Sequence, residues 1–149
     1  MLHVPVKRFA HGIGLELPTH ATIDSAGIDL RAAVAARVIL PSGGRALIPT
    51  GISLALPSGY EGQVRPRSSL ALKYGVTILN SPGTVDADYR GELKVLLMNH
   101  GDQPFTVHRG NRVAQLVIAP TTTVSLQEAN DLPDSGRGIG GFGSTGIGS

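Results

Sequence analysis

The sequence predicts an all-β sandwich or barrel with one short helix. Short apolar or alternating runs recur along the chain, and clusters rich in glycine and proline separate them. Many short strands with frequent turns are typical of β-sandwiches and β-barrels. The length of 149 residues fits a single domain with a substantial core.

The expected strands are the apolar or alternating runs that lie between turn signals. In chain order these runs are Val4–Phe9, Ile28–Ala33, Arg37–Leu40, Ala46–Ile48, Ile52–Leu56, Gly62–Arg65, Val76–Leu79, Leu93–Met98, Phe105–His108, Arg112–Ile118 and Thr122–Leu126. The turns are marked by Pro41–Gly44, Pro57–Gly59, Ser81–Gly83, Gly101–Asp102 and Gly110–Asn111. The last of these predicts a hairpin turn before the strand that starts at Arg112.

One helix is expected, over Ser68–Lys73, where two serines precede Leu70. Serine is a favoured N-cap residue, so a simple helix cap is one interpretation of these hydroxyls. Arg67 lies directly before them, and the free N–H groups of a helix start favour an anion. A phosphate site is therefore the other interpretation.

Composition excludes several classes of function. Cysteine is absent, which excludes disulfides and thiolate zinc sites and fits a reducing cytosol, so a cytoplasmic location is expected. The net charge of +2 and the scattered basic residues argue against a nucleic-acid partner. No apolar run approaches the roughly 20 residues of a membrane span, and Met1–Ala10 lacks the pattern of a signal peptide. No membrane partner is expected.

The densest run of chemically active side chains is Gly83–Glu92. In an extended chain Asp86 and Asp88 would share one face, where two carboxylates can hold a divalent cation or one can act as a general base. Tyr89, one of three tyrosines, follows them directly. A polar hairpin turn with a solvated face is the alternative interpretation.

A carboxylate also lies inside the apolar run 28–33. Asp29 would be buried or half-buried there, and such a group needs a partner. Arg112 and Gln115 follow the predicted turn at Gly110–Asn111. A structural ion pair for Asp29 and a surface-facing Gln115 are the alternatives to functional roles.

The last fourteen residues, 136–149, are half glycine. Arg137 can bind phosphate through its guanidinium, Phe142 can stack on a base, and Ser144 and Thr145 can donate to phosphate oxygens. Glycine-rich chain is costly to order. The segment is therefore either a lid that orders over a ligand or a disordered linker.

Five segments, taken in order, resemble the ordered motifs of the trimeric dUTP diphosphatase (dUTPase) family. They are Ala26–Leu30, Pro66–Leu70, Gly83–Glu92, Arg112–Leu116 and Arg137–Gly146. The resemblance implies a jelly-roll-like β fold that assembles as a homotrimer, with a β domain over 1–128 and a flexible arm over 129–149. It also implies hydrolysis of dUTP to dUMP and pyrophosphate with Mg²⁺, which removes dUTP and supplies dUMP for thymidylate synthesis.

The resemblance implies roles for individual residues of the β domain. Asp86 is similar to the general base that activates the attacking water. Tyr89 is similar to the ring that packs against the deoxyribose, where a ribose 2′-OH would clash. Asn80 matches a position that contacts uracil, and the main chain nearby, at Gly83, reads the base edge.

The phosphate contacts that the resemblance implies come from two parts of the chain. They are Arg67, Ser68, Ser69 and Gln115 in the β domain, and Arg137, Gly143, Ser144 and Thr145 in the tail. Phe142 is similar to the ring that covers uracil, and Asp29 to an acid near the water shell of the metal, with Arg112 as its partner. In the family each site draws on three subunits, and the tail comes from a different chain than the base-binding residues.

Two other functions are compatible with this fold. One is a dCTP deaminase-like enzyme, and the other is a non-catalytic nucleotide-binding protein. The run Gly83–Glu92 and the tail Arg137–Thr145 argue against the deaminase. No catalytic residue of the dUTPase motifs is lost, which argues against the non-catalytic protein.

Overall fold

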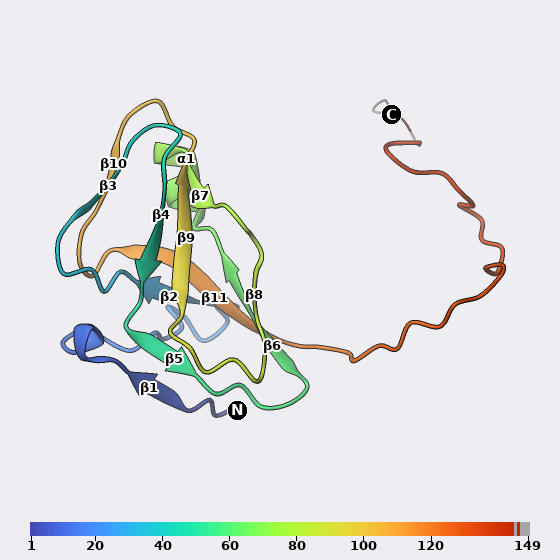
Figure 1. Ribbon diagram of the computed structural model, residues 1–149, viewed down its shortest axis with the longest axis horizontal. Coiled ribbons are helices and arrows are strands. Elements are labelled where there is room, and N and C mark those ends of the chain that lie inside the picture. The colour runs from blue at the N-terminus through green and yellow to red at the C-terminus, as the bar shows by residue number, and fades with distance from the viewer. Residues whose placement is uncertain (145, 147–149) are drawn as a thin grey trace.

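Four antiparallel sheets build the β domain (Figure 1). The structure, a computed structural model, describes residues 1–144 and 146. The four-stranded sheet has the order β2 (Gly27–Arg31), β11 (Arg112–Pro120), β6 (Tyr60–Arg65) and β8 (Gly83–Val85). The three-stranded sheet has the order β4 (Arg45–Pro49), β9 (Lys94–Asn99) and β7 (Val76–Ile78). Two pairs complete the domain: β1 (Val6–Arg8) with β5 (Ile52–Leu54), and β3 (Val38–Leu40) with β10 (Phe105–Val107).

The core forms because alternate residues of the strands point inward. Along β9, Val95 and Leu97 are fully buried, and they pack in one cluster with Ile48 of β4. The four-stranded sheet adds Leu30 from β2 and Leu116 from β11, each at most 1% exposed. Both larger sheets therefore share one hydrophobic core.

The expected helix is present as α1 (Ser68–Tyr74), one residue longer than predicted. It ends because Gly75 adopts a left-handed conformation, with φ of 67°, and donates its N–H to the carbonyls of Ala71 and Leu70. The simple N-cap interpretation of the serines is wrong. Arg67 occupies the N-cap position in extended conformation, and no side chain caps the helix there.

Three local predictions differ from the structure. The run Thr122–Leu126 is not a strand, because it leaves the sheet after β11 and no strand of the described chain lies beside it to accept its hydrogen bonds. Strand β8 was not predicted, since three residues carry too little periodicity. The turn at Gly110–Asn111 does not close a hairpin, because β10 pairs with β3 while β11 pairs with β2 and β6.

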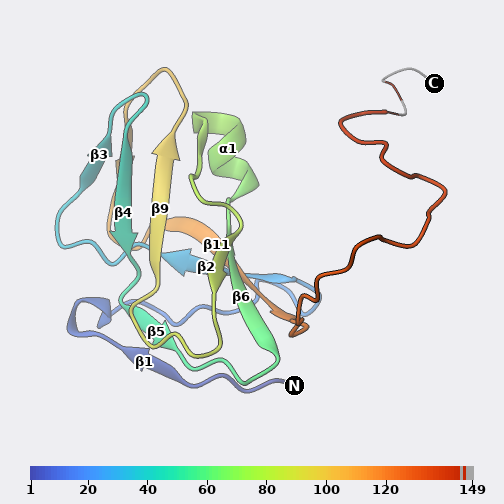
Figure 2. The same ribbon diagram turned by 45° about the vertical axis from the view of Figure 1, so that its right-hand side comes forward.

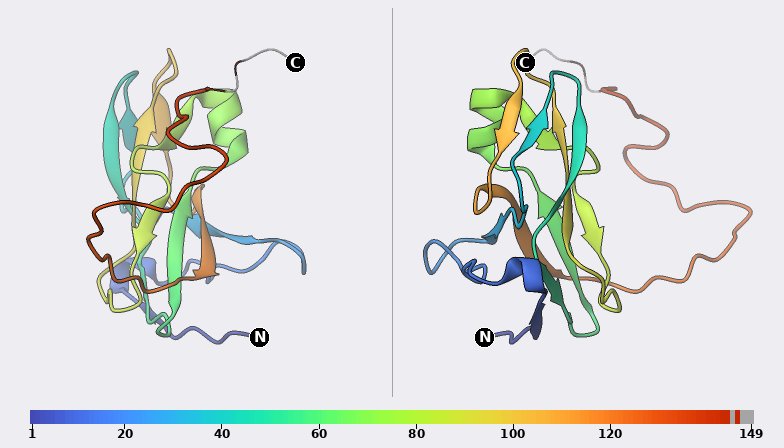
Figure 3. Two further views of the ribbon diagram at one scale, coloured as in Figure 1. Left: turned by 90° about the vertical axis from the view of Figure 1, so that its right-hand side faces the viewer. Right: turned by 60° about the vertical axis from the view of Figure 1, so that its left-hand side comes forward.

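After β11 the chain leaves the β domain as an extended arm. Every residue from Thr121 to Ile139 is exposed, and Figures 1 and 2 and the right-hand view of Figure 3 show this segment running away from the sheets. A short 3₁₀ turn, η1 (Ala10–Gly12), follows β1. Over residues 1–144 and 146, no helix has the length and apolar character needed to cross a membrane.

Candidate active site

A cleft of about 380 Å³ lies between the segment that follows β7 and the strands β4 and β9. Its polar lining consists of Asn80, Gly83, Thr84, Asp86, Tyr89, Glu92 and Lys94, and Leu47, Ile78 and Leu96 are among its apolar residues. The volume is in the range of small-molecule sites. The structure thus brings together four residues that the sequence selected: Asn80, Gly83, Asp86 and Tyr89.

Asp86 lies at the cleft because β8 ends one residue before it. Strand β8 pairs with β6, and the Tyr89 N–H then donates to the Asp86 carbonyl at 3.1 Å, which closes a turn. The extended-chain interpretation, with Asp86 and Asp88 on one face, is therefore wrong. Asp86 is exposed and lines the cleft, whereas Asp88 is exposed outside its lining.

The Tyr89 ring is held at the mouth of the cleft by its own loop. The phenol hydroxyl donates to the main-chain carbonyl of Glu92 at 3.0 Å. The Arg90 guanidinium donates to the carbonyls of Ala87 and Tyr89, at 2.6 and 3.0 Å, so the turn before the ring is also restrained. The ring remains 46% exposed and can be contacted by a ligand.

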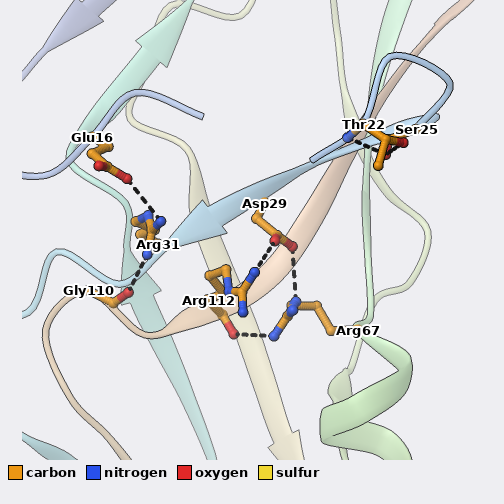
Figure 4. A network of polar contacts seen from close by, with 8 residues as sticks. All are labelled: Glu16, Thr22, Ser25, Asp29, Arg31, Arg67, Gly110 and Arg112. Carbon is orange, nitrogen blue, oxygen red and sulfur yellow. Dashed lines mark hydrogen bonds and ion pairs between the residues drawn. The ribbon is translucent and has the colours of Figure 1, made fainter. Parts of the chain in front are cut away.

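A second group of predicted residues gathers around Asp29 (Figure 4). Arg67 Nε donates to one carboxylate oxygen at 2.9 Å, and Arg112 Nη1 donates to the other at 3.2 Å. Arg67 Nη1 also donates to the Arg112 carbonyl at 3.3 Å. The ion pair expected for Asp29 is present, and it orients two guanidinium groups on the same side of the domain.

Gln115 and Ser68 border an open depression of about 500 Å³ beside this network. Gln115 is half-buried rather than surface-facing, because its Nε2 donates to the Pro66 carbonyl at 2.9 Å. Ser68 and Ser69 are exposed in the first turn of α1. The depression also includes Ser81 and Pro82, so the turn 80–83 contributes to this depression and to the cleft.

The tail residues do not reach either place within one chain. Arg137 Nε donates to the Gly140 carbonyl at 2.7 Å, and the Phe142 side chain is fully exposed. Gly143 and Ser144 are exposed as well. Thr145 lies outside the described residues. A single chain therefore places the third motif at the cleft, gathers residues of the first, second and fourth motifs around Asp29, and leaves the fifth apart.

Sequence reasoning missed three residues at or near the cleft. Glu92 entered only as the end of the run Gly83–Glu92, although it lines the cleft. Lys94 could have been found from the alternation of β9, where it begins the strand as an exposed residue. His11, which contacts Glu92, gave no signal because 81 positions separate the two residues.

The metal-binding side chains of the described residues do not form a site for a permanently bound metal ion. Among the described residues, no group of three or more His, Cys, Asp or Glu side chains is arranged to hold a metal ion. Both oxygens of Asp29 face arginines. A divalent cation fits this site if a ligand with its own oxygen donors brings it, since Mg²⁺ is usually held by a few carboxylates, waters and substrate phosphates.

Comparisons with known proteins identify the family. A sequence model described as dUTPase matches residues 14–146. A protein of Rhizobium rhizogenes named deoxyuridine 5′-triphosphate nucleotidohydrolase is 57% identical over 94% of this chain and 91% of its own length. A protein of the same name from Beijerinckia indica is 57% identical over 97% of this chain and 91% of its own length.

A solved dUTPase structure has the same fold as this chain. The dUTPase of Staphylococcus bacteriophage 80alpha, solved with dUpNHpp, superposes with a TM-score of 0.88 and 26% identity, covering 99% of this chain and 100% of that one. The predicted fold class is confirmed. Because the family model spans most of the sequence and both relatives match over nearly all of it, the chain belongs to the dUTPase family.

Proposed function

We propose that this chain hydrolyses dUTP to dUMP and pyrophosphate, which removes dUTP and supplies dUMP for thymidylate synthesis. The observation that carries the proposal is the meeting of Asp86, Tyr89, Asn80 and Gly83 at one cleft of small-molecule size. The relatives named deoxyuridine 5′-triphosphate nucleotidohydrolase support the substrate and the reaction.

Asp86 is the general base. Its exposed carboxylate takes a proton from a water molecule, and the resulting hydroxide-like oxygen attacks a phosphorus of the triphosphate. The products require that the bond between the α- and β-phosphates breaks and that pyrophosphate leaves. A positioned base of this kind contributes about 10²–10⁴-fold to the rate.

The cleft recognises the nucleoside part of dUTP. Asn80 and the main chain at Gly83 hydrogen-bond the uracil edge, and cytosine would leave these groups unpaired because its exocyclic amine reverses a donor and an acceptor. Gly83 is buried, and a Cβ placed on it would lie 3.3 Å from the Asn80 amide nitrogen, so a side chain there would crowd the Asn80 amide. The Tyr89 ring packs against the deoxyribose and excludes a ribose 2′-OH.

The residues around Asp29 bind the triphosphate. Arg67 is oriented by Asp29, and arginine suits phosphate because its planar guanidinium donates two parallel hydrogen bonds. Ser68 and Ser69 keep their hydroxyls available, since neither caps α1. Gln115 completes the group from β11.

The active unit is a homotrimer with shared sites, in which the arm 129–149 of one subunit closes a site on the β domain 1–128 of another. This proposal explains why the arm runs away from the β domain of its own chain (Figure 1), and why none of Arg137, Phe142, Gly143 and Ser144 lines the cleft. Thr145 would act with them. Leu47 of β4, which is 56% exposed, and its cross-strand neighbour Leu96 of β9 both line the cleft, where the arm of another subunit could cover them.

Mg²⁺ is the cofactor, and the phosphate oxygens of dUTP would hold it. Asp29 would reach the water shell of the ion rather than the ion itself, because Arg67 and Arg112 already occupy its oxygens. When bound, the ion neutralises charge on the phosphates during phosphoryl transfer. Arg67 and Arg137 add positive charge from the protein.

One assay tests the proposed function. Pyrophosphate release is measured with dUTP, dCTP, dTTP and UTP, and we expect turnover with dUTP and little with the other three. Ammonia release from dCTP would indicate a deaminase, and tight dUTP binding without turnover would indicate a non-catalytic protein. Neither alternative is favoured, since the relatives carry the name of a nucleotidohydrolase.

A further inference from the structure

A contact between His11 and Glu92 joins the N-terminal turn η1 to the wall of the cleft. His11 Nε2 lies 2.6 Å from Glu92 Oε1, and the same oxygen accepts the N–H of Gly51 at 2.9 Å. The Glu92 side chain is 12% exposed, and Lys94 Nζ lies 4.0 Å from its other oxygen. A carboxylate with two donors on one oxygen in a mostly buried place has a defined position.

The turn that carries His11 is itself held from two sides. Arg109 donates through Nη1 to the His11 carbonyl and through Nη2 to the Ile13 carbonyl, both at 2.8 Å. Gly12 is buried against Gly51, and a Cβ on Gly12 would collide with the Gly51 carbonyl. The imidazole of His11 is therefore presented to Glu92 by a restrained segment of main chain.

Glu92 in turn restrains the Tyr89 side chain. The phenol hydroxyl donates to the main-chain carbonyl of Glu92 at 3.0 Å, and both residues line the cleft. The hydroxyl also packs against Gly91, where an added Cβ would collide with it. The position of the Tyr89 ring thus depends on where Gly91 and Glu92 are held.

We propose that His11, acting through Glu92, is a positioning residue for Tyr89 and thereby sets how strongly a deoxyribose substrate is preferred over a ribose one. The inference rests on the proposed function, because it assumes that Tyr89 faces the sugar. A ring that must exclude one hydroxyl group has to be held to within a fraction of an ångström. Without His11, one donor to Glu92 is lost, the segment Tyr89–Glu92 loosens, and space opens for a 2′-OH.

The test compares kcat and KM for dUTP and for UTP in four variants. His11→Ala removes the donor, His11→Gln keeps an amide donor, and Gly91→Ala displaces the phenol directly. His100→Ala is the matched control, since His100 is exposed just beyond the other end of β9 from Lys94. Thermal unfolding is recorded for each protein.

We expect the ratio of kcat/KM for dUTP to that for UTP to fall about tenfold in His11→Ala and Gly91→Ala, mainly through a lower KM for UTP. His11→Gln restores most of the ratio, and His100→Ala leaves it unchanged. The inference is overturned if His11→Ala leaves the ratio of the two kcat/KM values unchanged, either with no effect or with an equal loss of kcat/KM on dUTP and UTP. In that case dUTP turnover by the wild type still upholds the proposed function. If His11→Ala does not fold, Gly91→Ala decides by the same criterion. Absence of dUTP turnover in the wild type overturns the proposed function and this inference with it.

Discussion

The Arg67 guanidinium donates from Nε to Oδ1 of Asp29 at 2.9 Å, although 38 positions separate the two residues in the sequence. Arg112 occupies Oδ2 of the same carboxylate at 3.2 Å. The Asp29 side chain is 27% exposed, and those of Arg67 and Arg112 are 21% and 51% exposed. One half-buried carboxylate therefore fixes the direction of two cations that remain accessible to a ligand.

Replacing this carboxylate tests the arrangement. In Asp29→Asn the charge is lost while the shape is kept, so both guanidinium groups lose a charge-assisted hydrogen bond of about 1.5–3 kcal/mol. We expect kcat/KM for dUTP to fall about 10-fold to 100-fold, mainly as a rise in KM, because phosphate contacts lose their orientation. Steady-state kinetics check this, with Asp24→Asn in the exposed loop before β2 as the control. A KM equal to that of the wild type would contradict the role of Asp29.

Substitutions of Asp86 and Asp88, two aspartates of the same turn, test the role of Asp86 as the general base. We expect Asp86→Asn to lower kcat at least about 10²-fold while dUTP binding is retained, because an amide cannot accept the proton of water. Asp88→Asn is the control, since Asp88 is exposed two residues away and does not line the cleft. Turnover is measured by pyrophosphate release and affinity by calorimetry. Full activity of Asp86→Asn would refute the assignment.

Mixing two inactive proteins tests the shared site. Deletion of 136–149 removes no residue that the structure describes as part of the core, so the truncated protein should keep its unfolding temperature and lose nearly all hydrolysis. Refolded together with Asp86→Asn subunits, it should recover a measurable fraction of wild-type activity, because an intact tail from one subunit can close an intact cleft on another. Mixed trimers as inactive as either parent would rule out closure between subunits, and wild-type turnover by the truncated protein alone would rule out a lid.

Removal of Mg²⁺ separates catalysis from folding. With EDTA, we expect dUTP hydrolysis to fall at least about 10-fold, since charge on the phosphates is no longer neutralised. The unfolding temperature should stay constant, because the described residues contain no cluster that could hold a structural metal ion. Added Mg²⁺ should restore turnover. A large drop in the unfolding temperature with EDTA would point to a resident ion instead.

Local patterns predicted most of the elements on which the site is built, with β8 as the exception. The runs Leu93–Met98 and Gly62–Arg65, with turn residues between the strands, predicted the strands found at Lys94–Asn99 and Tyr60–Arg65, because side-chain direction in a strand depends only on the residue and its neighbours. The same reasoning failed for Thr122–Leu126, which has strand-like residues but no neighbouring strand in the described chain. A strand is completed by its partner, and the sequence pattern does not state whether one is present.

The sequence by itself determined which chemistries this protein carries: a candidate base at Asp86, a ring at Tyr89, candidate phosphate-binding groups at Arg67 and Gln115, and a glycine-rich tail. Only the tertiary structure decided which of them meet. Sheet register pairs Gln115 with Asp29, and the turn after β8 directs Asp86 toward the cleft. The contact between His11 and Glu92 spans 81 positions and follows from no local rule. Contacts of this kind depend on topology and register, which arise from burying one core rather than from any single segment.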